Sequence, residues 1–233
     1  MSSATPAIEA DEKQILMPQF DDLGQQAYAS SLGMWLFLAS EVMFFSGLLA
    51  AYTIYRARWP HEFAAASRLL NWPLGFINTA VLLVSSLAMA LAVRAAQLGR
   101  RRETVRWMVL TMILGTAFLG IKASEYYVDY REHLIPGLNF EMPHEIHGAE
   151  VPADLDPGHF QMFFVLYFFI TGLHAFHMIV GITIVGIIAY LVHTRWFSGH
   201  GESQVEVIGL YWHFVDVVWV FLYPLLYLID IHS

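Results

Sequence analysis

The chain has 233 residues, of which 57% are hydrophobic and 14% are charged, and its mean hydropathy is +0.52. This composition is too apolar for an ordinary soluble domain, and the formal net charge of -8 argues against a nucleic-acid partner. The sequence has no cysteine, which excludes disulfides, iron-sulfur clusters, thiolate-bound copper and haem attached through cysteine.

A polar, acidic segment precedes five apolar runs. Residues 1–30 lack both the apolar stretch of a secretory signal and the arginine content of a transit peptide, so we predict a short solvated tail. A helix needs roughly 20 apolar residues to cross a bilayer, and the runs of suitable length cover residues 32–55, 72–98, 105–127, 160–192 and 205–229. The sequence therefore predicts an all-α integral membrane protein, in which residues 31–233 form one bundle of five transmembrane helices.

Positive charge is concentrated on one side of the predicted membrane. With five spans, the tail and the second and fourth connections lie on the same side, and most of the arginines on that side are Arg94, Arg100, Arg101, Arg102 and Arg106. Cytoplasmic connections carry the excess of Lys and Arg. We therefore predict a cytoplasmic N-terminus and an external C-terminus.

The one long connection, residues 131–158, combines four prolines with many acidic residues. Loops of this length are usually functional or mobile, so we predict an extended external loop. Its histidines and their neighbour at the start of the fourth span are His133, His144, His147 and His159. They lack the helical spacing of a known metal motif, and we interpret them as a solvated segment that buffers protons or meets a partner.

Ionisable residues inside the apolar runs need an explanation, because charge in hydrocarbon is costly. The first run contains Glu41, and the third contains Lys122 and Glu125 at a spacing that allows a helical ion pair. The fourth run places His174 and His177 on one side of its helix. Glu41 has no partner near it in sequence, which makes it the strongest candidate for a functional group.

The last run carries a polar face. At alternating steps of three and four residues, one stripe is formed by Glu206, Gly209, His213, Asp216, Val220, Tyr223 and Tyr227. We predict that this stripe faces protein, that the other faces meet lipid, and that His213 and Asp216 form a pair.

Three interpretations of these groups are open. A haem or metal site would need histidines at matching depth on facing helices, and His177 and His213 differ in predicted depth. A proton or ion path would use the carboxylates as relays. Structural pairing is the third interpretation, and it is favoured for each pair taken singly.

Five segments occur in an order that touches every span: GMWLFLASEVMFFSGLLAAY at 33–52, INTAVLLVSS at 77–86, KASEYY at 122–127, TGLHAFHMIVG at 171–181 and YWHFVDVVWVFLY at 211–223. Together they resemble subunit III of the haem-copper respiratory oxidases.

The resemblance implies a subunit with no haem or copper of its own that catalyses no step alone. It implies that the partners of this chain are the catalytic subunit I and subunit II, which carry the haem and copper of a proton-pumping terminal oxidase. Such a subunit supports proton uptake, protects the catalytic centre and holds structural phospholipids. A bacterial plasma membrane is the implied location, and further respiratory-complex subunits are possible partners at the 131–158 loop.

The resemblance also implies roles for single residues, none of them catalytic or metal-binding. Glu41 matches the family's buried glutamate, which reacts with hydrophobic carbodiimides. The remaining residues correspond to lipid-cleft, packing and hydrogen-bonding positions, and they are Lys122, Glu125, His174, His177, Glu206, His213 and Asp216.

The chain lacks the first two spans of the seven-span form of the family. In that form the two spans make a lobe that binds phospholipid against the remaining bundle, and whether this chain binds lipid in that way is open. The electron donor is also open. The alternatives to a cytochrome c oxidase are a quinol oxidase or a homologue associated with nitric oxide reductase. From another class, an independent ion-coupled transporter would use Glu41 and Asp216.

Overall fold

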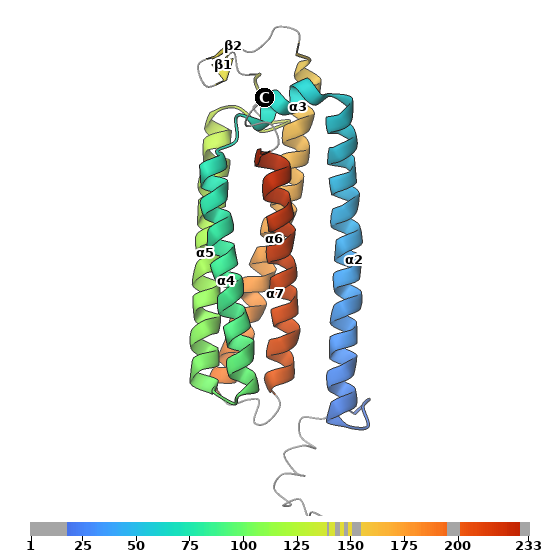
Figure 1. Ribbon diagram of the computed structural model, residues 1–233, viewed down its shortest axis with the longest axis vertical. Coiled ribbons are helices and arrows are strands. Elements are labelled where there is room, and N and C mark those ends of the chain that lie inside the picture. Colours follow the sequence, from blue (N-terminus) through green and yellow to red (C-terminus); the bar gives the residue numbers. More distant parts are fainter. Residues whose placement is uncertain are drawn as a thin grey trace, which may run out of the picture.

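The computed structural model describes residues 18–138, 140–142, 145–146, 149–150, 155–194 and 201–228. Most of them lie in long helices that run side by side (Figure 1). The helices are α2 (Leu23–Arg58), α3 (Pro60–Ser67), α4 (Trp72–Gln97), α5 (Arg101–Arg131), α6 (Pro157–His193) and α7 (Gly201–Tyr223), and α7 continues as a π-helical segment, Pro224–Leu228. In the described part of the chain, all of these except α3 are long and apolar enough to cross a membrane, which confirms the five predicted spans.

Local capping places two helix starts outside the predicted boundaries. The Asp22 side chain accepts a hydrogen bond from the Gln25 backbone N–H at 2.7 Å, so α2 begins within the segment predicted to be a tail. The Asp156 side chain accepts a hydrogen bond from the Gly158 backbone N–H at 2.7 Å, and α6 begins at Pro157. Capping residues satisfy the free N–H groups of a first turn, and hydropathy alone does not detect them.

The connection between α5 and α6 has a short stretch of strand structure among its described residues. It contains a short antiparallel pair, β1 (Glu145–Ile146) and β2 (Ala149–Glu150), in which Glu145 pairs with Glu150. His144 and His147 of the predicted histidine group lie outside the described residues. The role predicted for this loop stays a prediction.

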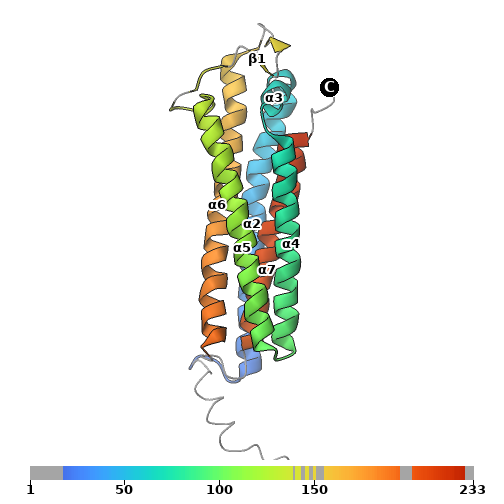
Figure 2. The same cartoon turned by 90° about the vertical axis from the view of Figure 1, so that its left-hand side faces the viewer.

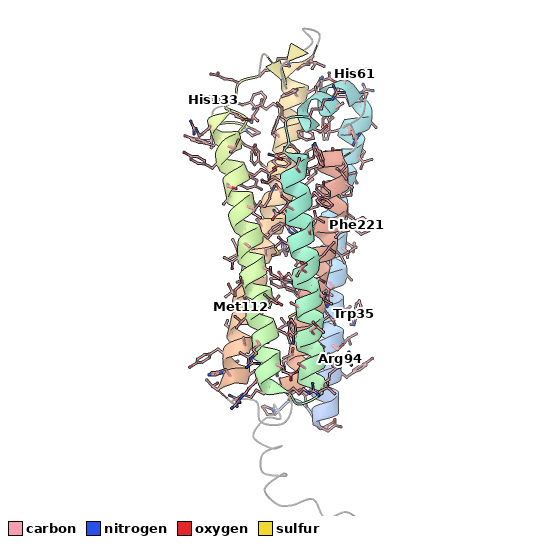
Figure 3. The ribbon with its side chains drawn as sticks, turned by 60° about the vertical axis from the view of Figure 1, so that its left-hand side comes forward. Trp35, His61, Arg94, Met112, His133 and Phe221 are labelled. Atoms are coloured by element: carbon pink, nitrogen blue, oxygen red, sulfur yellow. The ribbon has the colours of Figure 1, made fainter. Side chains whose placement is uncertain are left out.

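Helices α4, α5, α6 and α7 form a closed four-helix bundle, with α4 packed on α5 and α7, and α6 packed on the same two helices (Figure 2). Helix α2 stands at the side and packs more sparsely on α6 and α7, while α3 lies across one end (Figure 1). We call this end, where α3 and the α5–α6 connection lie, the α3 end. It holds His61 and His133, and Arg94 lies near the opposite end (Figure 3).

Burial differs sharply between α2 and α7. Only 11% of the most apolar window of α2 is buried, against 50% for α7. The exposed side chains of α2 include Trp35, Leu36 and Met43, with 57–77% of their surface accessible. From this difference we infer that α2 faces lipid or a partner and that α7 is central to the bundle.

Trp212 is one of the side chains through which α7 contacts all three other helices of the bundle. Its indole N–H donates to Ser85 Oγ on α4 at 3.1 Å, and its ring lies against Gly115 of α5 and Gly181 of α6. A Cβ at Gly115 would meet the Trp212 ring at 2.8 Å. Small residues therefore let the bundle close around a large aromatic ring.

The buried face of α7 only partly matches the predicted stripe. Gly209, Asp216, Tyr223 and Tyr227 face protein as predicted, whereas Glu206 and Val220 are exposed. The centre of the face is occupied by Trp212 and Trp219, which are at most 1% exposed. Burial of two indole rings decides the rotation of this helix, because large aromatic side chains contribute more packing area than the polar groups do.

Candidate functional site

A buried polar cluster joins α5, α6 and the π-helical segment. Lys122 Nζ lies 3.0 Å from Glu125 Oε2 and donates to the hydroxyls of Tyr167 and Tyr227 at 3.1 and 2.9 Å. Both tyrosines donate to Glu125 Oε1, at 3.0 and 2.6 Å. Lys122 is 2% exposed and Glu125 5%. We call these four residues the Lys122 network, and its ion pair is the one predicted from the sequence.

Donors and acceptors balance in the Lys122 network. The ammonium group has three N–H donors and finds three oxygens, while the two tyrosine O–H groups both reach the free oxygen of Glu125. The ammonium also lies 5.2 Å from the centre of the Trp219 ring. A buried ion pair is stable only when its remaining hydrogen-bonding capacity is used in this way.

Sequence reasoning did not assign Tyr167 or Tyr227 to this cluster. Tyr227 reaches it because the chain changes to π-helical geometry at Pro224, which has no N–H to continue the α-helical pattern. Tyr167 lies on α6, 42 residues from Glu125 in sequence. Only the packing of α6 on α5 brings it close.

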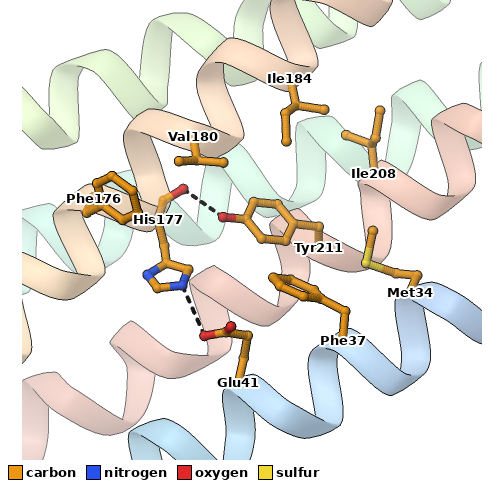
Figure 4. Close-up of a pocket in the computed structure, with 9 residues that line it drawn as sticks. All are labelled: Met34, Phe37, Glu41, Phe176, His177, Val180, Ile184, Ile208 and Tyr211. Carbon is orange, nitrogen blue, oxygen red and sulfur yellow. Dashed lines mark hydrogen bonds and ion pairs between the residues drawn. The ribbon is translucent and has the colours of Figure 1, made fainter.

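Glu41 has a partner that is distant in sequence. His177 Nε2 on α6 lies 3.1 Å from Glu41 Oε2 (Figure 4). On the other side of the ring, His177 Nδ1 lies 2.9 Å from the Leu173 carbonyl oxygen. That carbonyl can only accept, so Nδ1 carries a proton. One further proton is then shared between Nε2 and the Glu41 carboxyl, giving either an ion pair or a neutral pair.

The Glu41–His177 pair borders a pocket of about 290 Å³ between α2, α6 and α7. The other lining residues are mainly apolar, among them Phe37, Val180 and Ile208 (Figure 4). The Tyr211 hydroxyl donates to the His177 carbonyl oxygen at 3.0 Å beside it. The pocket therefore offers an apolar molecule access to a single carboxyl group that can exchange a proton.

The predicted pairing of His213 with Asp216 does not form. A 2.7 Å hydrogen bond joins His213 Nδ1 to Ser86 Oγ on α4. Asp216 is 2% exposed, and neither of its carboxyl oxygens has a hydrogen-bond partner among the described residues, although Ser86 lies beside it. Spacing of three residues permits a contact between two side chains on one helix, but here the His213 ring forms its hydrogen bond with Ser86 of α4 instead.

The two remaining candidate residues, His174 and Glu206, differ from each other in burial. His174 is fully buried between the rings of Phe118 and Trp219, at centroid distances of 5.5 and 5.0 Å, and neither ring nitrogen has a partner within the described residues. Glu206 is exposed and accepts a hydrogen bond from the Gln97 side chain. His174 is thus a packing residue, and Glu206 joins the ends of α4 and α7.

The histidines of the spans do not converge on one point. His177 faces α2, His174 faces α5 and α7, and His213 faces α4. Across the residues that the structure describes, no group of three or more His, Cys, Asp or Glu side chains is arranged to hold a metal ion.

Five apolar helices long enough to cross a membrane, four of which close into one bundle around the buried Lys122 network, define a multi-pass helical-bundle membrane protein. The chain belongs to the cytochrome c oxidase subunit III family, whose sequence model matches residues 25–131 and 159–230. This match covers all five spans and confirms the resemblance in the sequence.

Curated relatives come from oxidases of two kinds. The chain is 31% identical to cytochrome c oxidase subunit 3 of Corynebacterium diphtheriae, over 86% of this chain and 88% of the relative. It is 29% identical to quinol oxidase subunit 3 of Bacillus spizizenii, over 86% and 87%. It is also 31% identical to cytochrome c oxidase subunit 3 of Pelomedusa subrufa, over 84% of this chain but 67% of that longer relative.

Glu41→Gln is expected to abolish labelling at this position by dicyclohexylcarbodiimide and to leave the amount of the chain recovered in its complex unchanged. Carbodiimides add to protonated carboxyl groups, and an apolar reagent partitions into the pocket beside Glu41. Mass spectrometry of the labelled chain measures the reaction. Glu206→Gln, at an exposed carboxyl, is the control and should label like the wild type. Loss of the chain from its complex in Glu41→Gln would instead indicate a role in assembly.

Proposed function

We propose that this chain is the non-catalytic subunit III of a haem-copper terminal oxidase in a bacterial plasma membrane. The family match across all five spans carries the proposal. Subunits I and II would then hold the haem and copper, and oxygen would be reduced there. The absence of cysteine from this chain fits such a division, because thiolate-bound copper belongs to the electron-entry subunit.

The proposed contribution of this chain is a rigid, lipid-compatible flank for the catalytic subunit. The α4–α7 bundle is held by the Lys122 network and by the aromatic core around Trp212. Helix α2, in contrast, exposes Leu36, Met43 and Trp35, the last of which is labelled in Figure 3. Apolar surface of this kind is covered by lipid or by another membrane helix. We infer that the α2 side meets the catalytic subunit or its boundary lipid.

Support of proton uptake is the second part of the proposal, and it rests on the Glu41–His177 pair. The pair holds one exchangeable proton next to a pocket that opens between α2 and the bundle. With the proposed cytoplasmic N-terminus, the pair lies within the membrane spans of a subunit that flanks the proton-uptake side of the catalytic subunit. Buried proton-sharing pairs of this kind can exchange protons without a stable charge in hydrocarbon.

Cytochrome c is the proposed electron donor of the complex. The relatives that reach 31% identity are named cytochrome c oxidase subunit 3, and the quinol oxidase relative named above reaches 29%. Turnover of the purified complex with reduced cytochrome c, compared with turnover with a quinol, tests this assignment. Turnover with the quinol but not with reduced cytochrome c would instead assign the chain to a quinol oxidase.

Purification of the tagged chain from its native membrane in mild detergent tests the proposed function as a whole. A catalytic subunit with haem absorbance should co-purify at a stoichiometry of one to one, identified by mass spectrometry and a visible spectrum. A chain that purifies alone and moves ions in proteoliposomes would replace the proposal with an ion-coupled transporter.

A further inference from the structure

A second cavity, of about 540 Å³, lies at the α3 end between the start of α4 and the last turns of α5. Its acidic residues are Glu125 and Asp129 of α5 and Glu132, which follows the last turn of that helix. Steps of four and three residues place the three carboxyl groups on one face. Glu125 belongs to the Lys122 network, whereas Asp129 and Glu132 have no part in it.

Asp129 is the member of this cavity whose charge has no counterpart in the described part of the chain. It is 5% exposed, and its buried Oδ2 atom has no hydrogen-bond partner among the described residues. The charged groups that act on it are Glu125, Glu132 and Lys122, and Lys122 already pairs with Glu125 at 3.0 Å. A buried carboxylate without a donor is costly. The cavity therefore calls for a cationic group that donates hydrogen bonds.

The other polar residues around the cavity use their donors elsewhere. On the α4 side, Pro73 has no N–H, and the N–H of Leu74 donates to the Asn71 side chain at 3.1 Å. On the α5 side, the Ser124 hydroxyl donates to the Ile121 carbonyl oxygen at 2.7 Å. We infer that the missing donor comes from another molecule.

An arginine side chain matches this cavity better than a lysine side chain does. The guanidinium group donates hydrogen bonds in a planar fork, so one group can reach two carboxyl groups, here those of Asp129 and Glu132. The apolar walls at Leu70 and Val128 suit the methylene stem of the side chain. A bound metal ion is not favoured, because the described residues include no group of side chains arranged to hold one.

The surface next to the cavity indicates that the arginine belongs to a membrane helix. On α4, Trp72 lines the cavity and leads along one face to Phe76, Leu83 and Leu87, each of which is 48–61% exposed. Since Trp72 begins a span, the cavity lies near the membrane surface and this face extends into the apolar layer. A small soluble cation would leave the face uncovered. A helix with an arginine at its end would cover the face and fill the cavity.

We propose that the α4–α5 side of this chain binds a membrane helix of another subunit, and that an arginine at the end of that helix pairs with Asp129 and Glu132 in the cavity. The cavity lies on the side of the bundle away from α2 (Figure 1). Because the α2 side is the one proposed to meet the catalytic subunit or its boundary lipid, the partner at the cavity is a different chain.

The test uses the intact complex, so it rests on the function proposed above. The photo-reactive residue benzoylphenylalanine replaces Val128 at the cavity wall or, in a second variant, Phe76 on the apolar face. Mass spectrometry then identifies the peptide that each probe captures on irradiation. The probe at Val128 should capture a segment with an arginine within one helical turn, and the probe at Phe76 should capture the same helix deeper in the membrane.

The visible spectrum of the same preparation reports whether the catalytic subunit is present. A wild-type preparation without haem absorbance would count against the proposed function. A preparation with haem absorbance but without a captured arginine segment would count against this inference alone.

Asp129→Asn is expected to lower the amount of the captured subunit that co-purifies by at least about tenfold, because the buried charge that pairs with the guanidinium is lost. Glu132→Gln, at the exposed rim, should lower it by a smaller factor, and it keeps the test open if Asp129→Asn does not fold. Glu103→Gln is the control, because this carboxyl lies at the other end of α5, where it pairs with Arg100 at 3.4 Å. It should leave co-purification unchanged.

Changing the captured arginine to glutamine should reduce co-purification as Asp129→Asn does. Combining the two changes should add little, because both remove the same pair. An arginine-to-lysine change should restore only part of the binding. Capture of a phospholipid at Val128, or of a segment without arginine, would overturn the proposal, as would wild-type co-purification in both Asp129→Asn and Glu132→Gln.

Discussion

Lys122→Met is expected to destabilise the subunit by about 3–5 kcal/mol, the usual cost of removing one partner of a buried ion pair. Glu125 would keep its tyrosine donors but lose its cation, so its carboxyl group would have to remain charged in a 5% exposed site or take up a proton there. A change of about 3 kcal/mol corresponds to roughly a hundredfold increase in the unfolded fraction. The measurement is the amount of this chain that remains in the detergent-solubilised complex after heating.

Two comparisons separate the buried charge from the loss of a lysine as such. Arg100→Gln breaks an ion pair of the same i,i+3 spacing at the N-terminus of the same helix, between the cap residue Arg100 and Glu103, but there the side chains are 60% and 47% exposed. Its expected cost is under about 1 kcal/mol. The double variant Lys122→Met with Glu125→Gln should recover much of the lost stability, because no unpaired charge remains. A single Lys122→Met variant as stable as wild type would show that the network contributes nothing.

Gly115→Leu is expected to prevent closure of the α4–α7 bundle. Even a Cβ at this position would meet the Trp212 ring at 2.8 Å, and that ring is also held by Gly181 and by the hydrogen bond to Ser85. Because the indole has no free space to move into, overpacking should cost at least about 1–3 kcal/mol. Thermal stability of the complex and resistance of the chain to added protease report the effect.

Gly120→Leu is the matched control for Gly115→Leu. It lies on the same helix, and a Cβ there would have nothing within 4 Å. The same increase in side-chain volume should therefore be tolerated at residue 120. Equal losses at both positions would mean that helix α5 rejects leucine for a reason other than contact with Trp212.

The family and the five spans could be predicted from the sequence because both depend on local patterns. Hydropathy over about 20 residues identifies a span whatever surrounds it. The Lys122–Glu125 pair could also be predicted, because helical geometry brings residues three apart into contact. The pairing of His213 with Asp216 was wrong, although it used the same rule, because Ser86 on another helix competes for the histidine.

Contacts between helices could not be predicted from local sequence patterns. The partner of Glu41 is His177, 136 residues away, and Tyr227 reaches Glu125 across 102 residues. The burial of Asp129 was also missed, although its position one turn after Glu125 was a usable signal. Each of these contacts depends on which face of a helix turns inward.

The sequence by itself determined the class of protein, the number of spans and the identity of the ionisable groups within them. Those features follow from composition and from periodicity along one helix. Tertiary structure decided which of the groups are satisfied, which are paired across helices and which line a cavity. The physical reason is that in a membrane every face of a span is largely apolar, so hydropathy does not set helix rotation. Close packing of glycines against Trp212 and the need to satisfy Lys122 and Glu125 set it instead.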